Sequence, residues 1–172
     1  FRVIPLYKDI EILGYGEEEA LSFLLSQEIS GVVFAPGHSC RFNHLINNFT
    51  QRGIPVVAVS TDAPKSKRLT TVCVNPRKNG ELAGELMANW MKGEVAILIG
   101  SQEIDDHYQK AIGFREALTQ FSSSSQLVSV LENQESENRA KENARKLLKK
   151  YPELSGIYIA TALCRGLSCS GR

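Results

Sequence analysis

Short apolar runs and longer amphipathic segments alternate along almost the whole chain. Apolar runs of about five residues predict buried strands, and apolar residues recurring every three to four positions predict helices that pack one face on a sheet. Strands are expected at 2–7, 31–35, 54–59, 71–74, 94–99, 126–131 and 154–160. Helices are expected at 17–27, 42–51, 79–91, 109–121 and 136–151. This alternation indicates an α/β fold made of βαβ units with mostly parallel sheets.

The clearest apolar run spans residues 54–59 and leads into a polar loop that contains Asp62 and Pro64. Such a run, rich in β-branched residues, predicts a strand buried on both faces. Ligands of open α/β sheets bind just outside the carboxyl ends of the strands. Asp62 is therefore expected where a small molecule would bind. An aspartate there is equally suited to hold the turn before Pro64, so both roles stay open.

Other polar residues follow the predicted strands in the same way. His38 follows 31–35, Ser60 follows 54–59, Asn75 follows 71–74, and His107 and Lys110 come soon after 94–99. Hydroxyl, amide and carboxylate groups together suit a polyhydroxylated small molecule, because each sugar hydroxyl both donates and accepts. Each residue also has a structural interpretation. Asn75 precedes Pro76 and can start a turn, and at least one of the aspartates 105 and 106 is expected to be an N-cap.

The helix patterns also predict which side chains face the core. The helix 42–51 has one face made of Phe42, Leu45, Ile46 and Phe49, and the helix 79–91 has one made of Leu82, Ala83, Leu86, Met87 and Trp90. From the helix 109–121, Ile112, Ala117 and Phe121 are expected to point inward. The segment 139–150 is rich in Lys and Arg with interleaved Glu, which is typical of a solvated helix face.

Composition narrows the classes of function. The 172 residues are 42% apolar and carry 20 basic and 19 acidic side chains, a net charge of +1. Nothing in this balance argues for a nucleic-acid-binding or membrane-surface domain, and no run approaches the ~18 apolar residues of a membrane span. The four cysteines match no zinc motif, and Cys73 is expected to be a buried hydrophobic residue. Reduced thiols and a cytoplasmic location are expected.

Enzyme motifs are missing from the sequence. It contains no GxGxxG, no GxxxxGK[ST] and no GxSxG string, and none of the histidines at 38, 44 and 107 has a histidine four residues away. The sequence therefore predicts no enzyme, no catalytic residue, no metal site and no cofactor.

An ordered set of strings resembles a known family. The order is GVVFAP, then RGIPVVAVSTDAP, then VNP followed by ELM, then VAILIG, then DDH with a later GF. Over residues 1–162 this resembles the sugar-binding core of the LacI/GalR-type bacterial transcription regulators. It is similar, almost equally, to the periplasmic sugar-binding proteins of ABC transporters, which share the type I fold.

The resemblance implies two Rossmann-like lobes joined by a hinge, with the ligand closed between them. We expect an N-terminal lobe at 1–75 that lacks its first strand and helix, and an incomplete C-terminal lobe at 76–162. The residues 163–172 show no period and are expected to form an irregular tail. The chain is therefore expected to be truncated at both ends.

The resemblance also names ligand positions, and the chain departs from the family at several of them. Ser60 and Asp62 stand where the family often has an acidic pair, and Asn75 replaces an aspartate. Lys110 replaces an arginine, which keeps the charge but loses the planar fork that grips neighbouring hydroxyls. His107 is common in the sugar-binding branch. Together with the strand-end position of His38, the expected ligand contacts are His38, Ser60, Asp62, Asn75, His107 and Lys110.

Two functions follow from the resemblance. The first is the effector domain of a bacterial LacI-type regulator that binds a sugar or sugar-like molecule, as a homodimer in the cytoplasm. It would bind DNA only through a separate helix-turn-helix absent from this chain, and it would not associate with a membrane. The alternative is a periplasmic sugar-binding protein of an ABC transporter. The sequence that precedes Phe1 discriminates between them.

Overall fold

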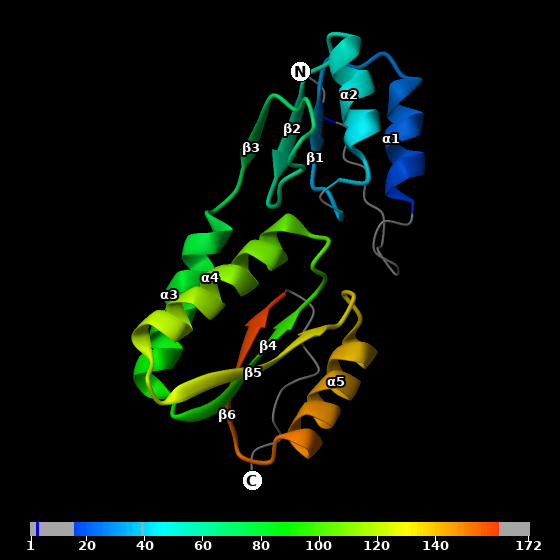
Figure 1. Ribbon diagram of the computed structural model, residues 1–172. Helices are drawn as coiled ribbons and strands as arrows, with labels where there is room; N and C mark the ends of the chain where they lie inside the picture. The colour runs from blue at the N-terminus through cyan, green and yellow to red at the C-terminus, as the bar shows by residue number, and fades with distance from the viewer. Residues whose placement is uncertain (1–2, 4–15, 39, 162–172) are drawn as a thin grey trace. The chain divides into compact units, whose positions relative to one another are not determined.

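A computed structural model describes residue 3 and residues 16–38 and 40–161 (Figure 1). The elements, in order, are α1 (Glu17–Leu25), β1 (Val32–Phe34), α2 (Asn43–Gln51), β2 (Val56–Val59), β3 (Thr70–Val72), α3 (Pro76–Trp90), β4 (Gly93–Ile99), α4 (Asp105–Phe121), β5 (Ser125–Glu132), α5 (Glu137–Lys150) and β6 (Leu154–Ala160). The predicted strand at 2–7, apart from residue 3, and the tail at 163–172 lie outside the described residues. No helix among the described residues is long and apolar enough to cross a membrane.

The chain divides into two compact units, Phe1–Cys73 and Val74–Arg172. Unit 1 holds a sheet of order β1-β2-β3 and unit 2 a sheet of order β5-β4-β6. All pairs within both sheets are parallel. The predicted α/β class with parallel sheets is thus confirmed.

The core of unit 1 lies between its sheet and the helices α1 and α2. Side chains at helical spacing on α2 are all buried, and they pack against Leu21 of α1 and against β1 and β2. These α2 side chains are Leu45, Ile46 and Phe49, with Phe42 just before the helix. In β2 only Val56 and Ala58 are buried, whereas Val57 and Val59 are partly exposed. The prediction that this strand is buried on both faces is wrong for the described residues, because the described helices α1 and α2 pack with the alternate residues only.

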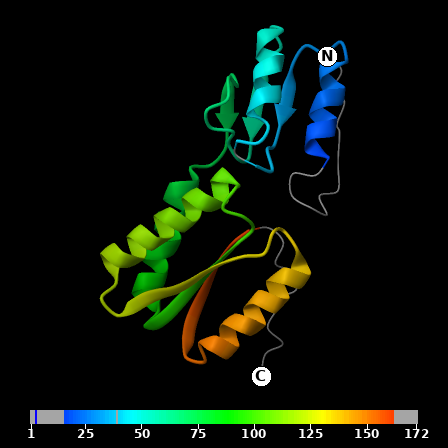
Figure 2. The same cartoon turned by 45° about the vertical axis from the view of Figure 1, so that its right-hand side comes forward.

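Unit 2 does contain a strand buried on both faces. In β4, the five residues from Val95 to Ile99 are all buried. Helices α3 and α4 lie side by side on one face of the sheet and α5 on the other, as the two views agree (Figures 1 and 2). The centre of this sheet is therefore the doubly covered environment that the sequence predicts for 54–59.

The buried face of α3 agrees only in part with the predicted one. Gly80 and Gly84 are buried, while Leu82, Leu86 and Trp90 are 59%, 39% and 72% exposed. A Cβ on Gly113 of α4 would lie 2.9 Å from the backbone nitrogen of Glu81. The two helices approach so closely that glycine is needed at the contact. The glycines therefore set the contact with α4, while Ala83 and Met87 of the predicted face do pack on the core of unit 2.

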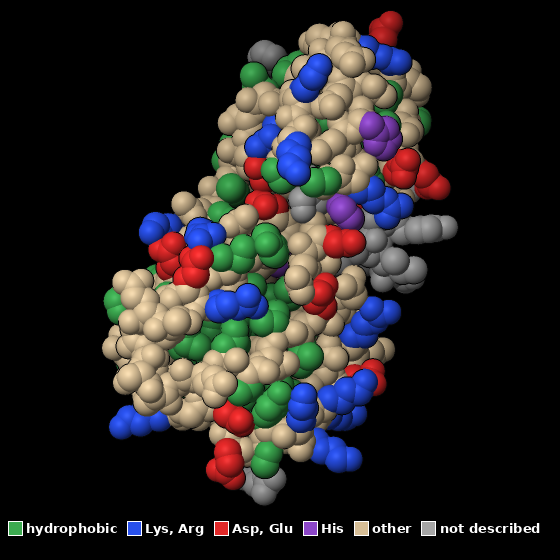
Figure 3. Space-filling model, in the orientation of Figure 1, with side chains coloured by type: hydrophobic (Ala, Val, Ile, Leu, Met, Phe, Trp, Pro, Cys, Tyr) green, Lys and Arg blue, Asp and Glu red, His purple; other side chains and the backbone are tan. Residues whose placement is uncertain are grey.

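Two further predictions about burial are wrong. Phe121 is 51% exposed, and the buried side of α4 is formed instead by residues such as Phe114 and Leu118. Cys73 is exposed, because it follows the end of β3 and does not lie inside the strand. The prediction of a solvated basic face is confirmed on α5, whose Lys and Arg side chains gather at the surface (Figure 3).

Candidate functional site

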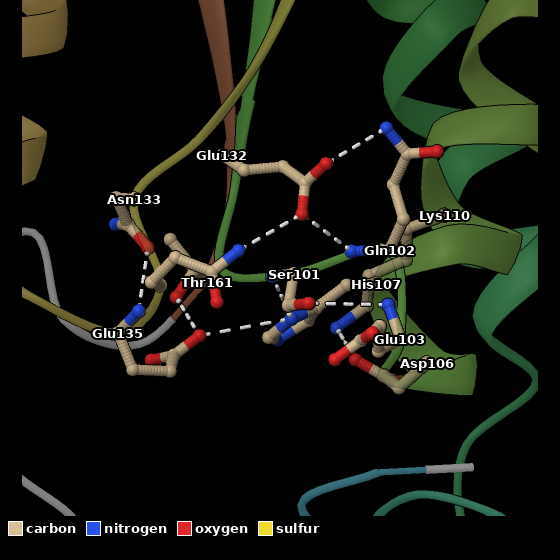
Figure 4. Close-up of polar contacts among 11 residues, drawn as sticks. Ser101, Gln102, Glu103, Asp106, His107, Lys110, Glu132, Asn133, Glu135 and Thr161 are labelled. Atoms are coloured by element: carbon tan, nitrogen blue, oxygen red, sulfur yellow. Dashed lines mark hydrogen bonds and ion pairs between the residues drawn. The ribbon is translucent and has the colours of Figure 1, made fainter. Parts of the chain in front are cut away.

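Polar residues meet at one edge of the unit 2 sheet. Because β4 lies between β5 and β6 and all three run parallel, their carboxyl ends share an edge. Gly100 and Ser101 follow β4, Asn133 to Glu135 follow β5, and Thr161 follows β6. Helix α4 begins beside them at Asp105 (Figure 4). We call this group the β4–β6 edge.

Glu132, the last residue of β5, joins the ends of β5 and β4. Its Oε2 accepts hydrogen bonds from the backbone N–H of Gln102 at 3.1 Å and from Nε2 of Gln134 at 3.1 Å. Its Oε1 accepts from Nε2 of Gln102 at 3.0 Å. All three donors are uncharged amides. The carboxylate is thus held in place by groups that leave its charge uncompensated.

The loop after β5 has an unusual backbone. Gln134 and Glu135 have φ values of 53° and 55°, in the left-handed region that non-glycine residues rarely occupy. Gln134 donates its N–H to the carbonyl of Gly100 at 2.7 Å, and Glu135 donates its N–H to Oδ1 of the fully buried Asn133 at 3.0 Å. These bonds hold the strained turn and direct the Glu135 side chain toward the ends of β4 and β6 (Figure 4).

His107, in the first turn of α4, lies within the same edge. Its Nδ1 accepts the N–H of Ser101 at 3.3 Å and lies 3.6 Å from Oε1 of Glu135. Oε1 of Glu135 also accepts the hydroxyl of Thr161 at 2.8 Å. Burial lowers the pKa of His107 below its usual 6.5, against the opposing influence of Glu135. The imidazole is therefore held mainly in its neutral form near pH 7.

Lys110, one turn further along α4, is paired with Asp106. Its Nζ donates to Oδ2 of Asp106 at 2.5 Å, and the two side chains are only 19% and 12% exposed. The predicted cation of the site thus already has a carboxylate partner. The structure brings the predicted residues His107 and Lys110 to one edge, as the strand-end rule requires.

The predicted residues of unit 1 lie in different surroundings. Asp62 accepts the backbone N–H of Ala63 at 2.7 Å and the Thr71 hydroxyl at 2.5 Å. Its carboxylate also pairs with the guanidinium of Arg68, with N···O distances of 2.5 Å to Oδ1 and 2.6 Å to Oδ2. We call these groups the Asp62 cluster. The turn role expected for Asp62 is therefore real, and whether it also contacts a ligand stays a prediction.

Three other residues that were predicted to contact the ligand form hydrogen bonds with nearby backbone groups. Ser60, directly after β2, has a φ of 69° and donates its N–H to the carbonyl of Val72 at 3.0 Å. Nδ1 of His38 accepts the N–H groups of Cys40 and Arg41 at 3.3 and 3.2 Å. Asn75 is the N-cap of α3, its Oδ1 accepting the N–H of Lys78 at 3.0 Å. Their ligand roles are not tested by these contacts.

The N-cap of α4 differs from the prediction. It is Ile104, without a side-chain cap, and Asp105 and Asp106 occupy the first turn of the helix. Carboxylates there still favour the positive end of the helix dipole. Helix α4 begins four residues earlier than the pattern predicts, which moves both aspartates inside it.

Sequence reasoning missed the residues that follow β5 and β6. Glu132, Gln134, Glu135 and Thr161 all stand at strand ends, so the rule that found His107 also covers them. Within the part of the chain that the structure describes, no group of three or more His, Cys, Asp or Glu side chains is arranged to hold a metal ion.

Comparison with known proteins identifies the family. The model of the periplasmic binding protein domain matches residues 17–166, so the chain belongs to that family. GanP, a glucose-galactose binding protein from Geobacillus stearothermophilus, is 30% identical over 85% of this chain, with a TM-score of 0.79. AraP, an arabinose binding protein from the same species, is 26% identical over 86% of this chain, with a TM-score of 0.69.

More distant structures share the fold. An ABC transporter solute-binding protein from Burkholderia graminis, in complex with D-arabinose, is 21% identical over 87% of this chain and has a TM-score of 0.83. This chain covers 52% of GanP, 51% of AraP and 52% of the Burkholderia protein, about half the length of each. A search of the curated proteins found no significant match.

Proposed function

We propose that this chain is part of a solute-binding protein and that its ligand is a carbohydrate. One observation supports the proposal most directly: the β4–β6 edge carries carboxylate and amide side chains that are already oriented by hydrogen bonds. Groups of this kind accept from and donate to sugar hydroxyls, and orientation in advance reduces the entropy that binding costs. Membership of the periplasmic binding protein domain family adds to this support.

The transport role, the alternative expected from the sequence, is the better supported one. The similar structures named above are sugar-binding and solute-binding proteins, one of them described as part of an ABC transporter. One argument for the cytoplasmic location of a regulator was a buried Cys73, and that cysteine is exposed. The regulator, with its DNA-binding domain, homodimer and cytoplasmic location, remains the second proposal from the resemblance. Sequencing upstream of Phe1 distinguishes the two, since a helix-turn-helix supports the regulator and a cleavable signal peptide supports transport.

A thermal-shift screen tests carbohydrate binding. The protein at its full natural length is heated with D-glucose, D-galactose, D-arabinose and D-fructose in turn. A sugar present at about 100 times its dissociation constant adds ~2.7 kcal/mol to the free energy of unfolding, which a melting curve detects readily. Glu132→Gln is expected to weaken that shift, and Glu137→Gln, a charge removal at the exposed start of α5, is the control. The absence of a shift with every sugar contradicts the proposal.

A further inference from the structure

Glu135 and His107 come together in space left open by Gly100. A Cβ at position 100 would lie 2.6 Å from Cε1 of His107 and 2.7 Å from Cδ of Glu135, distances that real side chains do not show. The two side chains are only 12% and 14% exposed, and they come from different elements, α4 and the loop after β5. The glycine thus makes room for a carboxylate and an imidazole at the end of the central strand.

The backbone of Glu135 is strained to reach this place. Gln134 and Glu135 are two successive left-handed residues that are not glycine, a conformation that persists only where the surroundings hold it. Here the surroundings are the amide of Asn133, the carbonyl of Gly100 and the hydroxyl of Thr161. Contacts from three strand ends therefore fix one carboxylate opposite one imidazole.

The observed hydrogen bonds define one of two possible arrangements of the ring. Nδ1 of His107 accepts the Ser101 N–H, so in this arrangement it carries no proton. A proton on Nδ1 turns that atom into a donor, which cannot accept from Ser101 and would donate instead to Oε1 of Glu135, 3.6 Å away. Among the residues that the structure describes, the other charged groups near the ring are Asp106 and Lys110, which are paired with each other.

We propose that Glu135 is a positioning residue for the His107 imidazole, and that protonation of His107 exchanges its Nδ1 partner from Ser101 to Glu135. This change of hydrogen-bond partner rotates the imidazole at the β4–β6 edge, so binding of a ligand there responds to pH. The change of partner is inferred from the contacts alone, and the effect on a ligand rests on the proposed function. Acidification is expected to weaken binding, because the orientation that Ser101 holds is lost.

The change of hydrogen-bond partner at His107 is tested without a ligand. The imidazole signal of His107 is followed by NMR during a pH titration of the protein at its full natural length. Glu135→Gln removes the carboxylate that receives the proton, so His107 is expected to take up its proton at a lower pH than in the wild type. Thr161→Val, which keeps the charge but frees the Glu135 side chain, is expected to move the midpoint in the same direction by less and serves if Glu135→Gln does not fold.

The control for this titration is Glu137→Gln. It removes a charge that is close to Glu135 in sequence but exposed at the start of α5. It is expected to leave the His107 midpoint unchanged. Midpoints equal to the wild type in both Glu135→Gln and Thr161→Val overturn the positioning role.

The ligand effect is tested by calorimetric titration with D-glucose, D-galactose and D-arabinose at about pH 7.5 and 5.5, on either side of the usual histidine pKa. Affinity in the wild type is expected to fall about fivefold or more at the lower pH, the size of an ordinary coupling between two sites. His107→Gln and Glu135→Gln are expected to lose most of this ratio, whereas Glu137→Gln keeps it. Equal affinities at both pH values in the wild type overturn the pH response. If neither these sugars nor D-fructose binds, the proposed function fails and the NMR titration still decides the positioning role.

Discussion

The two units hold a carboxylate at a strand end in opposite ways. In the Asp62 cluster of unit 1, the carboxylate faces the guanidinium of Arg68, so its charge is balanced within the protein. At the β4–β6 edge of unit 2, the contacts of Glu132 with the described residues are hydrogen bonds from amide N–H groups, without a cation. A carboxylate that is paired with a cation of the protein stabilises its own loop. A carboxylate bound only by neutral donors still has an unbalanced charge and free lone pairs with which to bind a ligand.

The difference changes which predicted residues are the stronger candidates. Both carboxylates lie near the carboxyl end of a parallel strand, Glu132 as the last residue of β5 and Asp62 in the loop that follows β2. Only the partners differ. Geometry at a strand end therefore locates a candidate site, and the hydrogen-bond partners decide how much of each side chain remains for a ligand.

The largest expected loss of stability comes from disturbing the close packing of α3 against α4 in unit 2, which supports the β4–β6 edge. In Gly113→Ala the new Cβ would lie 2.9 Å from the nitrogen of Glu81 and 3.1 Å from the carbonyl carbon of Arg77. Both are backbone atoms, so α3 and α4 must separate, at a cost of ~3 kcal/mol. Urea unfolding followed by the fluorescence of Trp90, the single tryptophan, measures this loss in unit 2.

Gly31→Ala in unit 1 is the matched control for that variant. Its Cβ would meet nothing closer than 3.6 Å, an ordinary contact. Its free energy of unfolding is expected to stay within about 0.5 kcal/mol of the wild type. Equal losses in the two variants would show that the close approach of α3 and α4 does not support the β4–β6 edge.

The next effect compares the two carboxylates directly. Asp62→Asn leaves Arg68 without its anion in a site where both side chains are about one-fifth exposed, and we expect unit 1 to lose about 1–3 kcal/mol. Glu132→Gln leaves no cation behind and is expected to cost less than ~1 kcal/mol. Hydrogen exchange measured residue by residue reports the two units separately. A larger loss in Glu132→Gln than in Asp62→Asn would reverse the comparison between the edges.

Much of the fold was predictable because apolar residues recur along the sequence at the spacing of helices and strands. Each described helix and strand overlaps a predicted one, and the apolar face of α2 is the predicted face. The packed side of α3 was predictable only in part, because the spacing of apolar residues finds Ala83 and Met87 but not the contact with α4. Its contact with α4 runs through Gly80 and Gly84, which carry no hydrophobic signal, while Leu82 and Trp90 mark a face that is exposed.

The candidate site was predictable in part. His107 and Lys110 follow a strongly apolar strand, so the strand-end rule finds them. Glu135 was missed because β5 alternates only weakly and because its position depends on a left-handed turn at a residue that does not favour one. The partners of Asp62 were also beyond prediction, since Arg68 and Thr71 reach it from a loop and from a neighbouring strand.

The smallest expected effect uses pH, because the β4–β6 edge carries a buried imidazole and the Asp62 cluster carries none. Burial lowers the pKa of His107 in the folded protein, whereas the unfolded chain takes up the proton near the usual 6.5. Between the folded pKa and 6.5 the unfolded state therefore binds more protons, so stability rises with pH in that window. The stability that His107 contributes is fully present above pH 6.5 and is lost as pH falls through the folded pKa.

In His107→Gln, this contribution to the dependence of stability on pH is expected to vanish from urea unfolding measured between about pH 7.5 and 5. His44→Gln, whose imidazole is 58% exposed, is expected to keep the wild-type slope. A slope that is unchanged in His107→Gln would mean that the imidazole gains as much from Glu135 as burial costs it, and the charge of the unit 2 edge would then be balanced internally, as it is in unit 1.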